Sequence, residues 1–510
     1  MIRWKKAAAA AAIAVTAALA VTSCAAGGTD GGDGAGGSLT LGTVAAPNSM
    51  AAADAQWGDN APYFQTVYDT VLLATPEGTI EPFLATEWSY NEDNTVLTLT
   101  IRDDVDFTDG EHLTADVVAQ NLQRFKDGTS PDAGYLASVA TVEAPDETTV
   151  VLTLSEPDPA LLDYLTRSAG VIASPATFDN PDAATEPIGS GPYILDTAAT
   201  VTGTSYSYTK NPDYWDPELQ HYDTVDIRVL TDPTAAVNAI KAGEVDTMRL
   251  LSNDALGEIE AAGWTVHPLE TEFAGFLLFD RAGTMNPALG DVRVRQAINY
   301  AIDREGLLTA LQSGLGSLTE QVFPERSAAY DPALDETYDY DPEKAKELLA
   351  EAGFADGLTI QMPSNAVFGA TTFVLLEQQM SDVGITLEHV DVPVGNYIAD
   401  LLAPKYASTY MTLEQNPDWQ LIQFMISPTA LFNPFRYEDP QVNEWIETIQ
   451  YGDEATQDAA LKELNAYIVD QAWFAPFYRA QNSFVTAAGT TVERLPSNVY
   501  PAIYDFQPNE

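Results

Sequence analysis

The feature that limits the fold most is an alternation of strand-like and helix-like segments over short loops. In residues 223–268, the segments DTVDIRVL, EVDTMRL and WTVHPL are typical of strands. The segments between them, PTAAVNAIKAG and NDALGEIEAAG, are typical of helices, and the first of these ends at Gly243. Strands that alternate with helices in this way form α/β sheets, so the sequence predicts an α/β fold.

A second set of alternating segments begins near Phe276. Residues 291–311 predict one helix, and a further helix begins after the cap Asp341 and ends at Gly353. The first helix is predicted to have an apolar face made of Val294, Ala297, Ile298, Ala301 and Ile302. The segments LTIQM, FVLLEQQMSDVG and ITLEHVDV then predict a β-α-β unit. Because 510 residues exceed what one hydrophobic core usually supports, the two sets predict two α/β lobes.

The N-terminal part of the folded region shows a different pattern. Residues 87–102 and 139–155 each predict two strands around a turn. Between them, residues 114–125 predict a helix with Thr114 as its N-cap. The sequence therefore predicts an extra antiparallel α+β subdomain within the first lobe.

The N-terminus has the features of a targeting segment. Three basic residues among the first six precede an apolar run over 7–21, which is short for a membrane span. Cys24, the only cysteine of the chain, follows Val-Thr-Ser at 21–23, and a glycine-rich stretch comes after it. This order resembles the lipobox of bacterial lipoproteins, which implies cleavage before Cys24 and its lipidation. We therefore expect a signal peptide over 1–23 and a lipidated, flexible tether over 24–38.

The charge and the residue patterns of the chain argue against several classes of function. With 75 acidic and 23 basic residues the formal net charge is −52, which repels nucleic acids. The four histidines are scattered without the spacing of a metal site. A glycine pattern at 32–37 matches a dinucleotide fingerprint only formally, because it follows no strand and opens no helix. We therefore expect neither an enzyme nor a resident metal or cofactor.

Eight segments spread over most of the chain resemble one family. They are VYDTVL (67–72), PFLATEW (82–88), VDFTDGEHLTADVV (105–118), GSGPYIL (189–195), KNPDYW (210–215), IKAGEVD (240–246), DVRVRQAINYAIDRE (291–305) and YDPEKAKELLAEAGF (340–354). On these segments the chain resembles the family 5 solute-binding proteins of bacterial ABC importers, the oligopeptide-, dipeptide- and nickel-binding group. The resemblance implies a two-lobed, periplasmic-binding-protein-like fold of type II, the Venus flytrap, which closes on a ligand between its lobes.

The resemblance also implies a domain plan, partners and a location. The N-terminal lobe is expected over 39–270, with the extra subdomain at about 60–188, and is completed by about 483–510. The C-terminal lobe is expected over 271–482. We expect a monomer that its lipid anchors to the outer face of the cytoplasmic membrane, in the periplasm or on the cell surface. There it would hand its solute to the permease of an ABC transporter.

Six residues are expected to contact the ligand. In peptide-binding relatives an aspartate of a C-terminal-lobe loop pairs with the α-ammonium of the peptide. The stretch LEQNPDWQLIQF (413–424) resembles that loop, which implies this role for Asp418. The same carboxylate is also placed to cap the helix-like segment that follows it. The other expected contacts are Asn416, Trp419, Phe273, Tyr63 and Trp57, and core packing is the alternative for each aromatic residue among them.

The resemblance leaves more than one function open. We expect a protein that captures short peptides between its lobes for an ABC importer. The alternative is the same fold with another solute, namely an oligosaccharide, an opine-like compound or a nickel chelate. A secreted lipoprotein enzyme is a third alternative, against which the lack of any catalytic constellation in the sequence argues.

Overall fold

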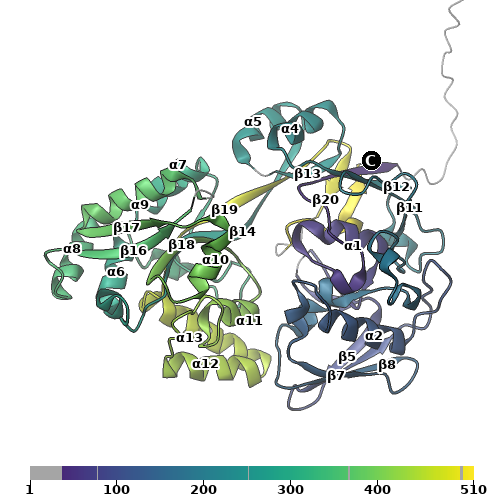
Figure 1. Cartoon of the computed structure of the whole chain (residues 1–510), viewed down its shortest axis with the longest axis horizontal. Helices are drawn as coiled ribbons and strands as arrows, with labels where there is room; N and C mark the ends of the chain where they lie inside the picture. Colours follow the sequence, from purple (N-terminus) through teal and green to yellow (C-terminus); the bar gives the residue numbers. More distant parts are fainter. Residues whose placement is uncertain (1–36, 77, 251, 366–367, 494–497, 510) are drawn as a thin grey trace, which may run out of the picture. The chain divides into compact units, whose positions relative to one another are not determined.

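The structure, a computed structural model, describes residues 37–509 apart from 77, 251, 366–367 and 494–497 (Figure 1). The predicted signal peptide, the predicted lipidation site Cys24 and nearly all of the predicted tether lie outside these residues. Among the helices that are described, none is long and apolar enough to cross a membrane.

Nine strands of the described residues form one mixed sheet in the order β10-β11-β12-β1-β13-β19-β14-β18, with β15 paired to β19. They are β1 (Ser38–Thr43), β10 (Tyr193–Leu195), β11 (Ser205–Lys210), β12 (Thr224–Val229), β13 (Thr247–Leu250), β14 (Thr265–Leu278), β15 (Gly316–Leu318), β18 (Ser408–Glu414) and β19 (Phe474–Thr486). Strand β1 is parallel to β12 and β13, and the remaining pairs are antiparallel. The alternation in 223–268 therefore feeds one sheet, as predicted.

In Figure 1, β14 and β19 run between the elements drawn on the left side of the view and those drawn on the right. The two strands pair along nearly their whole length, from Thr265 opposite Thr486 to Leu277 opposite Phe474. The predicted strand WTVHPL is thus only the beginning of a strand of 14 residues. Because β14 continues past Phe276, the two alternating sets share this strand.

The extra subdomain contains an antiparallel sheet in the order β5-β6-β8-β7 within the described part of the chain. Its strands are β5 (Ala85–Tyr90), β6 (Val96–Ile101), β7 (Val139–Glu143) and β8 (Thr149–Leu154), and helix α2 (Ala115–Lys126) contacts β7 and β8. Thr114 Oγ1 accepts a hydrogen bond from the backbone N–H of Val117 at 3.3 Å, as expected of the N-cap. Both predicted hairpins and the capped helix are confirmed.

The second alternating set differs from the prediction in one place. Strands β16 (Leu358–Ser364) and β17 (Ile385–Asp391) are parallel and joined by α9 (Ala370–Asp382), which confirms the β-α-β unit. Asp341 caps α8 (Pro342–Glu351), as predicted. The prediction of one helix over 291–311 is wrong, because α6 (Val292–Tyr300) and α7 (Arg304–Gln312) are separate. Asp303 accepts a hydrogen bond from Gly306 N–H at 2.8 Å and so starts a new helix, while the predicted apolar face is fully buried.

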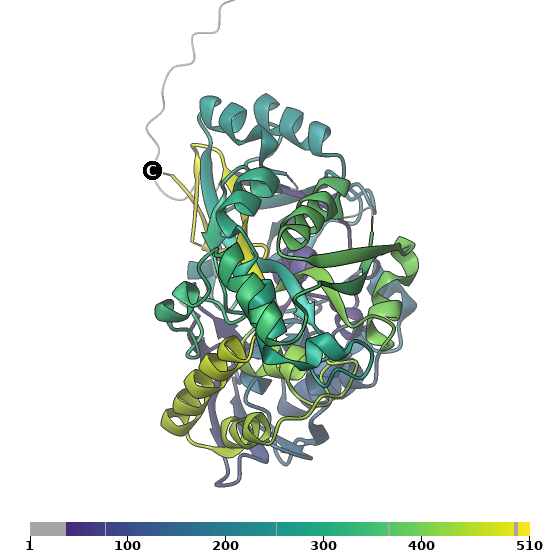
Figure 2. The same cartoon turned by 90° about the vertical axis from the view of Figure 1, so that its left-hand side faces the viewer.

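The other helices surround these sheets (Figure 2). They are α1 (Ala61–Val67), α3 (Leu161–Tyr164), α4 (Pro233–Ala242), α5 (Leu256–Ala261), α10 (Val394–Leu402), α11 (Asp418–Leu421), α12 (Pro440–Tyr451) and α13 (Glu454–Asp470). A π-helical turn over Ile422–Ile426 continues α11. Short strands complete the fold: β2 (Asp69–Thr70) with β9 (Val171–Ile172), β3 (Leu72–Ala74) with β4 (Ile80–Pro82), and β20 (Thr490–Val492) with β21 (Phe506–Pro508).

Three of the segments that resemble the family meet at one buried carboxylate. Asp69 is fully buried and accepts hydrogen bonds from Ser190 Oγ at 2.8 Å, Tyr214 OH at 2.9 Å and Trp215 Nε1 at 2.9 Å. Burial raises the pKa of Asp69 to about 6, although the three donors act in the opposite direction. These segments therefore form a structural junction.

The glycines on either side of Ser190 serve this junction by close approach. A Cβ atom at Gly189 would lie 2.2 Å from the carbonyl oxygen of Val67, and one at Gly191 would lie 2.5 Å from the carbonyl carbon of the same residue. Neither glycine is among the residues with positive φ in the described chain. The two glycines therefore leave room for a neighbouring backbone and do not supply a turn with positive φ.

Candidate ligand-binding site

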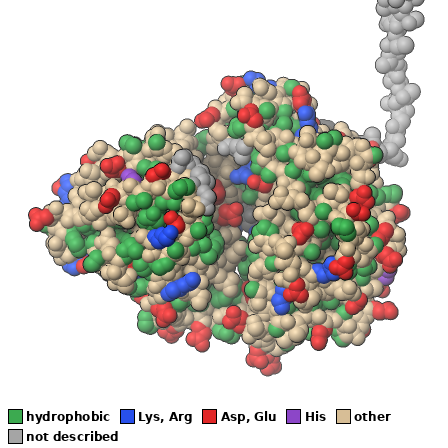
Figure 3. Space-filling view, viewed as in Figure 1, with side chains coloured by type: hydrophobic (Ala, Val, Ile, Leu, Met, Phe, Trp, Pro, Cys, Tyr) green, Lys and Arg blue, Asp and Glu red, His purple; other side chains and the backbone are tan. Residues whose placement is uncertain are grey.

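A polar cavity of about 660 Å³ lies at the end of β18 and beside β13 and β14. Figure 3 shows a hollow in the face that it presents, with acidic and basic side chains inside it. The cavity is lined by Ala45, Ala46, Asn48, Gln56, Trp57, Gly58, Asp59, Asn60, Asp132, Tyr135, Arg167, Arg249, Thr271, Glu272, Arg326, Glu414, Gln415, Asn416, Asn498 and Val499. Its walls thus combine carboxylates, guanidiniums and amides.

Strand β14 forms one wall through an irregularity in its pairing with β19. The register shifts immediately before Glu272, which makes Thr271 the extra residue of a bulge. Thr271 Oγ1 accepts a hydrogen bond from Asn482 Nδ2 at 2.7 Å, and its carbonyl accepts one from Gln415 N–H at 2.8 Å. Because successive side chains of a strand point to opposite faces, Glu272 lines the cavity while Phe273 is completely buried.

Two carboxylates stand opposite each other in this wall. Glu272 of β14 is in register with Glu414 of β18, and both residues line the cavity. Burial raises the pKa of Glu272, the guanidinium of Arg249 opposes this, and the carboxylate of Glu414 raises the pKa further. Like charges directly across an antiparallel pair are unfavourable, so this wall favours a cation in the cavity.

Arg249 of β13 is close to this carboxylate pair but is already engaged. Its Nη1 lies 2.7 Å from Asp59 Oδ1, and its Nη2 donates to Asn482 Oδ1 at 3.4 Å. The carboxylate of Asp59 offsets much of the positive charge of Arg249. The two glutamates are therefore only partly compensated by the protein itself.

Two further guanidiniums reach the cavity from separate parts of the chain. Arg167 precedes the 3-10 helix η4 (Ser168–Gly170), is buried, and lies 3.1 Å from Asp163 in an ion pair. Arg326 lies in the loop after β15, and its Nη2 donates to the carbonyl of Gln415. The side chain of Arg326 is accessible to solvent from the cavity. The surrounding walls nevertheless displace bulk water, and this desolvation, together with the charge of Arg167, lowers the pKa of Arg326 to about 10. The arginines form a cationic part of the cavity.

Asp418 stabilises the loop that carries Arg326. Its Oδ2 accepts a hydrogen bond from Ala328 N–H at 3.2 Å, and the hydroxyl of Ser327 is a further partner. Burial raises the pKa of Asp418. Asp418 is the first residue of α11, and the N-cap position is Pro417, which makes no side-chain cap bond. The alternative role as helix cap is therefore wrong.

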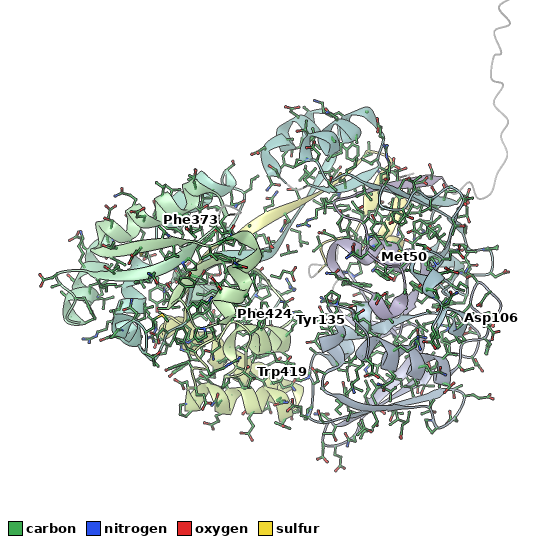
Figure 4. The ribbon with its side chains drawn as sticks, in the orientation of Figure 1. Met50, Asp106, Tyr135, Phe373, Trp419 and Phe424 are labelled. Carbon is green, nitrogen blue, oxygen red and sulfur yellow. The ribbon has the colours of Figure 1, made fainter. Side chains whose placement is uncertain are left out.

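Aromatic residues contribute another part of the lining. Tyr135, labelled in Figure 4, belongs to the 3-10 helix η3 (Ala133–Leu136) and stacks on Tyr164 with ring centroids 4.4 Å apart. Trp57 donates its indole N–H to Asn498 Oδ1 at 3.3 Å and its backbone N–H to Asp132 Oδ2 at 3.0 Å. These contacts fix the positions of the two rings. They also leave the carboxylate of Asp132 hydrogen-bonded to the protein itself.

The six residues predicted to contact ligand fall into three groups. Trp57 and Asn416 line the cavity. Tyr63, Phe273 and Trp419 are buried in the core, which is the alternative role expected of the aromatic residues, and Trp57 is buried in the core as well. Asp418 lies beside the cavity, outside the described residues that line it, so its contact with a ligand stays a prediction.

Sequence reasoning missed the charged residues of the cavity. Glu272 precedes the predicted Phe273, and strand alternation would have assigned the two side chains to opposite faces. Glu414 lies inside the stretch 413–424 that was already singled out. Arg167 and Arg326 are two of only 23 basic residues in an acidic chain, and because basic residues are scarce, each one is a candidate for a functional role. Their meeting in one cavity, however, depends on long-range packing.

Known proteins resemble this chain over most of its length. The family model described as "Bacterial extracellular solute-binding proteins, family 5 Middle" matches residues 79–435. The glutathione-binding protein GsiB of Shigella dysenteriae is 26% identical over 434 residues, which cover 81% of this chain and 83% of that protein.

Solved structures show the same fold. DppA of Helicobacter pylori in complex with the peptide STSA has a TM-score of 0.73 at 20% identity and covers 93% of this chain and 98% of its own. AgaA of Agrobacterium tumefaciens in complex with agropinic acid has a TM-score of 0.71 at 23% identity and covers 93% of this chain and 99% of its own. These likenesses confirm the fold expected from the sequence.

Proposed function

The chain belongs to the bacterial extracellular solute-binding proteins of family 5, and from this premise we propose that it captures short peptides with a free amino end for an ABC importer. The family's description agrees with a location outside the cytoplasm. The named relatives are binding proteins, and we extend this to the present chain as a protein that catalyses no reaction and needs no cofactor.

The observation that carries the proposal is the pair Glu272 and Glu414. A peptide ammonium is a compact cation with three donors, and two adjacent carboxylates offer it several acceptors and a countercharge. Since Arg249 is engaged with Asp59, the protein leaves this wall with unbalanced negative charge. A bound ammonium would balance it.

The remaining walls suit the rest of a short peptide. The volume of about 660 Å³ lies within the range of roughly 300–1,000 Å³ that is usual for ligand pockets. Amide side chains such as Gln56, Asn60 and Asn416 offer both donors and acceptors to peptide groups. Trp57 and Tyr135 offer apolar ring faces to side chains of the ligand.

A non-peptide solute is the alternative. The agropinic acid complex of AgaA favours an opine-like compound as the competing ligand class. The peptide bound to DppA and the name of GsiB favour the peptide class. An oligosaccharide carries no cation for the carboxylate pair, and no histidine lies in residues 413–424 to help hold a nickel chelate.

The domain plan and the anchor form part of the same proposal. We place the lobe boundary between 270 and 271 and between 482 and 483, where the bulge at Thr271 is bonded to Asn482. The N-terminal lobe then comprises 39–270 and 483–510. The mature protein is a monomer held at the outer face of the cytoplasmic membrane through lipidated Cys24, and the tether to residue 38 lets it reach its permease.

Native mass spectrometry of gently purified protein tests this function. We expect masses of short peptides to dissociate from the protein, and a mixed tripeptide library to replace them. Retention of an opine-like compound or a sugar, together with no retention of any library peptide, would overturn the peptide assignment.

A further inference from the structure

Two arginines are buried together at the start of the second alternating set, away from the ligand-binding cavity. Arg281 follows the end of β14 and is 2% exposed, and Arg295 lies on α6 and is 4% exposed. Neither forms an ion pair within 4.0 Å with a carboxylate of the described residues. Burial, and then the charge of Arg295, lower the pKa of Arg281 to about 9. The two guanidiniums thus act on each other as uncompensated like charges in the interior, where an unpaired charge is costly.

The hydrogen bonds of the two guanidiniums leave donors unused. Arg281 Nη1 donates to the carbonyl of Leu278 at 3.0 Å, and its Nη2 donates to Asn433 Oδ1 at 3.2 Å. Its Nε is buried and has no partner among the described residues. The three nitrogens of Arg295 donate to backbone carbonyls. Since a guanidinium has five N–H donors, both side chains retain donors for a further acceptor.

The carboxylates closest to these arginines in the sequence are engaged elsewhere. Asp280 is fully buried, and its oxygens accept hydrogen bonds from the backbone N–H groups of residues 284–286. Asp291 lies 2.6 Å from Arg293 in an ion pair. Neither carboxylate therefore balances the buried pair.

Aromatic rings cover Arg281, and strained backbone directs them there. The guanidinium carbon of Arg281 lies 4.4 Å from the ring centroid of Trp473 and 5.5 Å from that of Tyr437. The residues directly before these rings, Ala472 and Arg436, have φ angles of 47° and 53°, which are unusual for residues other than glycine. Such strain persists where the surrounding structure imposes it, and it clusters at functional sites. The fold therefore holds this arrangement at a conformational cost.

We propose that the guanidiniums of Arg281 and Arg295 bind a small inorganic anion of the kind of chloride. An anion between them would accept unused N–H donors of both and would turn their repulsion into two attractions. The rings compensate a cation in part, but a ring face offers no ordinary acceptor to the free Nε of Arg281. Because both side chains are almost completely buried, the structure favours a monatomic anion over a bulky phosphate or carboxylate ligand.

This anion would join the ends of the two long strands to their surroundings. Arg281 follows β14, Trp473 directly precedes β19, and Arg295 lies on α6. Arg295 also donates to the carbonyl of Gln471, the C-cap of α13, at 2.9 Å. None of these four residues is among the described residues that line the ligand-binding cavity. The anion therefore stabilises the scaffold and takes no part in solute recognition.

The dependence of stability on chloride tests the proposal. The urea unfolding midpoint of the ligand-free protein is measured in mixtures of sodium chloride and sodium gluconate at constant total sodium, so that screening of the negative surface is unchanged. In addition, crystals are soaked in sodium bromide, and anomalous scattering locates the bound ions. The variant is Arg281→Gln, and the control of equal charge change is Lys462→Gln, at an exposed position of α13.

With one bound ion, each tenfold rise in chloride above its dissociation constant should raise the folding equilibrium constant about tenfold. We expect this in the wild-type protein and in Lys462→Gln, and no dependence in Arg281→Gln. Bromide should give an anomalous peak between Arg281 and Arg295. If Arg281→Gln does not fold, the chloride dependence and the bromide peak of the wild-type protein decide.

Two results would overturn the inference. One is an equal unfolding midpoint of the wild-type protein in chloride and in gluconate. The other is a set of bromide peaks confined to the surface, which would indicate an adventitious ion only. No peptide enters either measurement, so the outcome is independent of the proposed function.

Discussion

Glu272 and Glu414 occupy directly opposite positions on β14 and β18, where antiparallel strands favour opposite charges. Both side chains line the same cavity, so the unfavourable pair is available to a ligand. The bulge at Thr271 lies immediately before Glu272, and Thr271 accepts hydrogen bonds from Asn482 and from the backbone of Gln415. The binding wall therefore carries a local electrostatic cost that a bound cation removes.

Removing one charge of this pair should stabilise the empty protein and weaken peptide binding. For Glu414→Gln we expect the free energy of unfolding, measured in urea without ligand, to rise by about 0.2–1 kcal/mol. The affinity for a peptide with a free amino end should fall, because one of two countercharges is lost. Glu388→Gln, an exposed position on β17, is the control and should change neither value. A less stable Glu414→Gln protein would contradict the account of the wall.

Asp418 offers a test between a ligand contact and a positioning role. Its hydrogen bond to Ala328 supports the loop of Arg326, so Asp418→Ala should weaken free and N-acetylated peptides by a similar factor. If Asp418 instead pairs with the ammonium, as the sequence resemblance implies, the variant should lose the preference for the free amino end. Calorimetric titration of both peptides into both proteins separates the two roles.

The junction at Asp69 predicts a dependence of stability on pH. Its pKa is raised from 3.8 to about 6, so between these values the folded protein retains a proton that the unfolded chain has released. The free energy of unfolding should therefore fall as the pH rises through this window, by about 3 kcal/mol from this group. Asp69→Asn cannot titrate, and its unfolding free energy should decrease less over the same window. Parallel curves for the two proteins would refute the assignment.

The predicted anchor is tested apart from binding. Cys24→Ser should abolish incorporation of radiolabelled palmitate and release the protein from the membrane fraction, because the chain contains no other cysteine. Peptide affinity should be unchanged, since every residue that lines the cavity lies beyond the tether. Membrane retention of the unlabelled variant would contradict the role of Cys24.

Local sequence signals predicted most of the fold. The cap Thr114, the Asp341-Pro342 start of α8 and the glycine end of α4 act through neighbouring residues, and each structure forms where the sequence indicates. The break between α6 and α7 was missed because the apolar periodicity continues through it, while the cap Asp303 restarts the helix. The length of β14 was missed because strand pairing with β19 continues beyond the alternation signal.

The site was less predictable, because it depends on which residues meet across the chain. Trp57 and Asn416 were found through family resemblance, and both line the cavity. The aromatic ring of Phe273 is predicted to contact ligand, but it is buried in the core, and the neighbouring Glu272 lines the cavity. No local pattern brings Arg167 to Arg326, since 159 positions of sequence separate them (326 minus 167).

If the carboxylates of Glu272 and Glu414 receive a peptide ammonium, the affinity must depend on the charge of the peptide's amino end. The peptide that the protein retains best is titrated into the wild-type protein with its amino end free and with its amino end acetylated. We predict that acetylation lowers the affinity about tenfold or more, because it removes the cation and leaves the two carboxylates uncompensated. Equal affinity for the two forms would contradict the account.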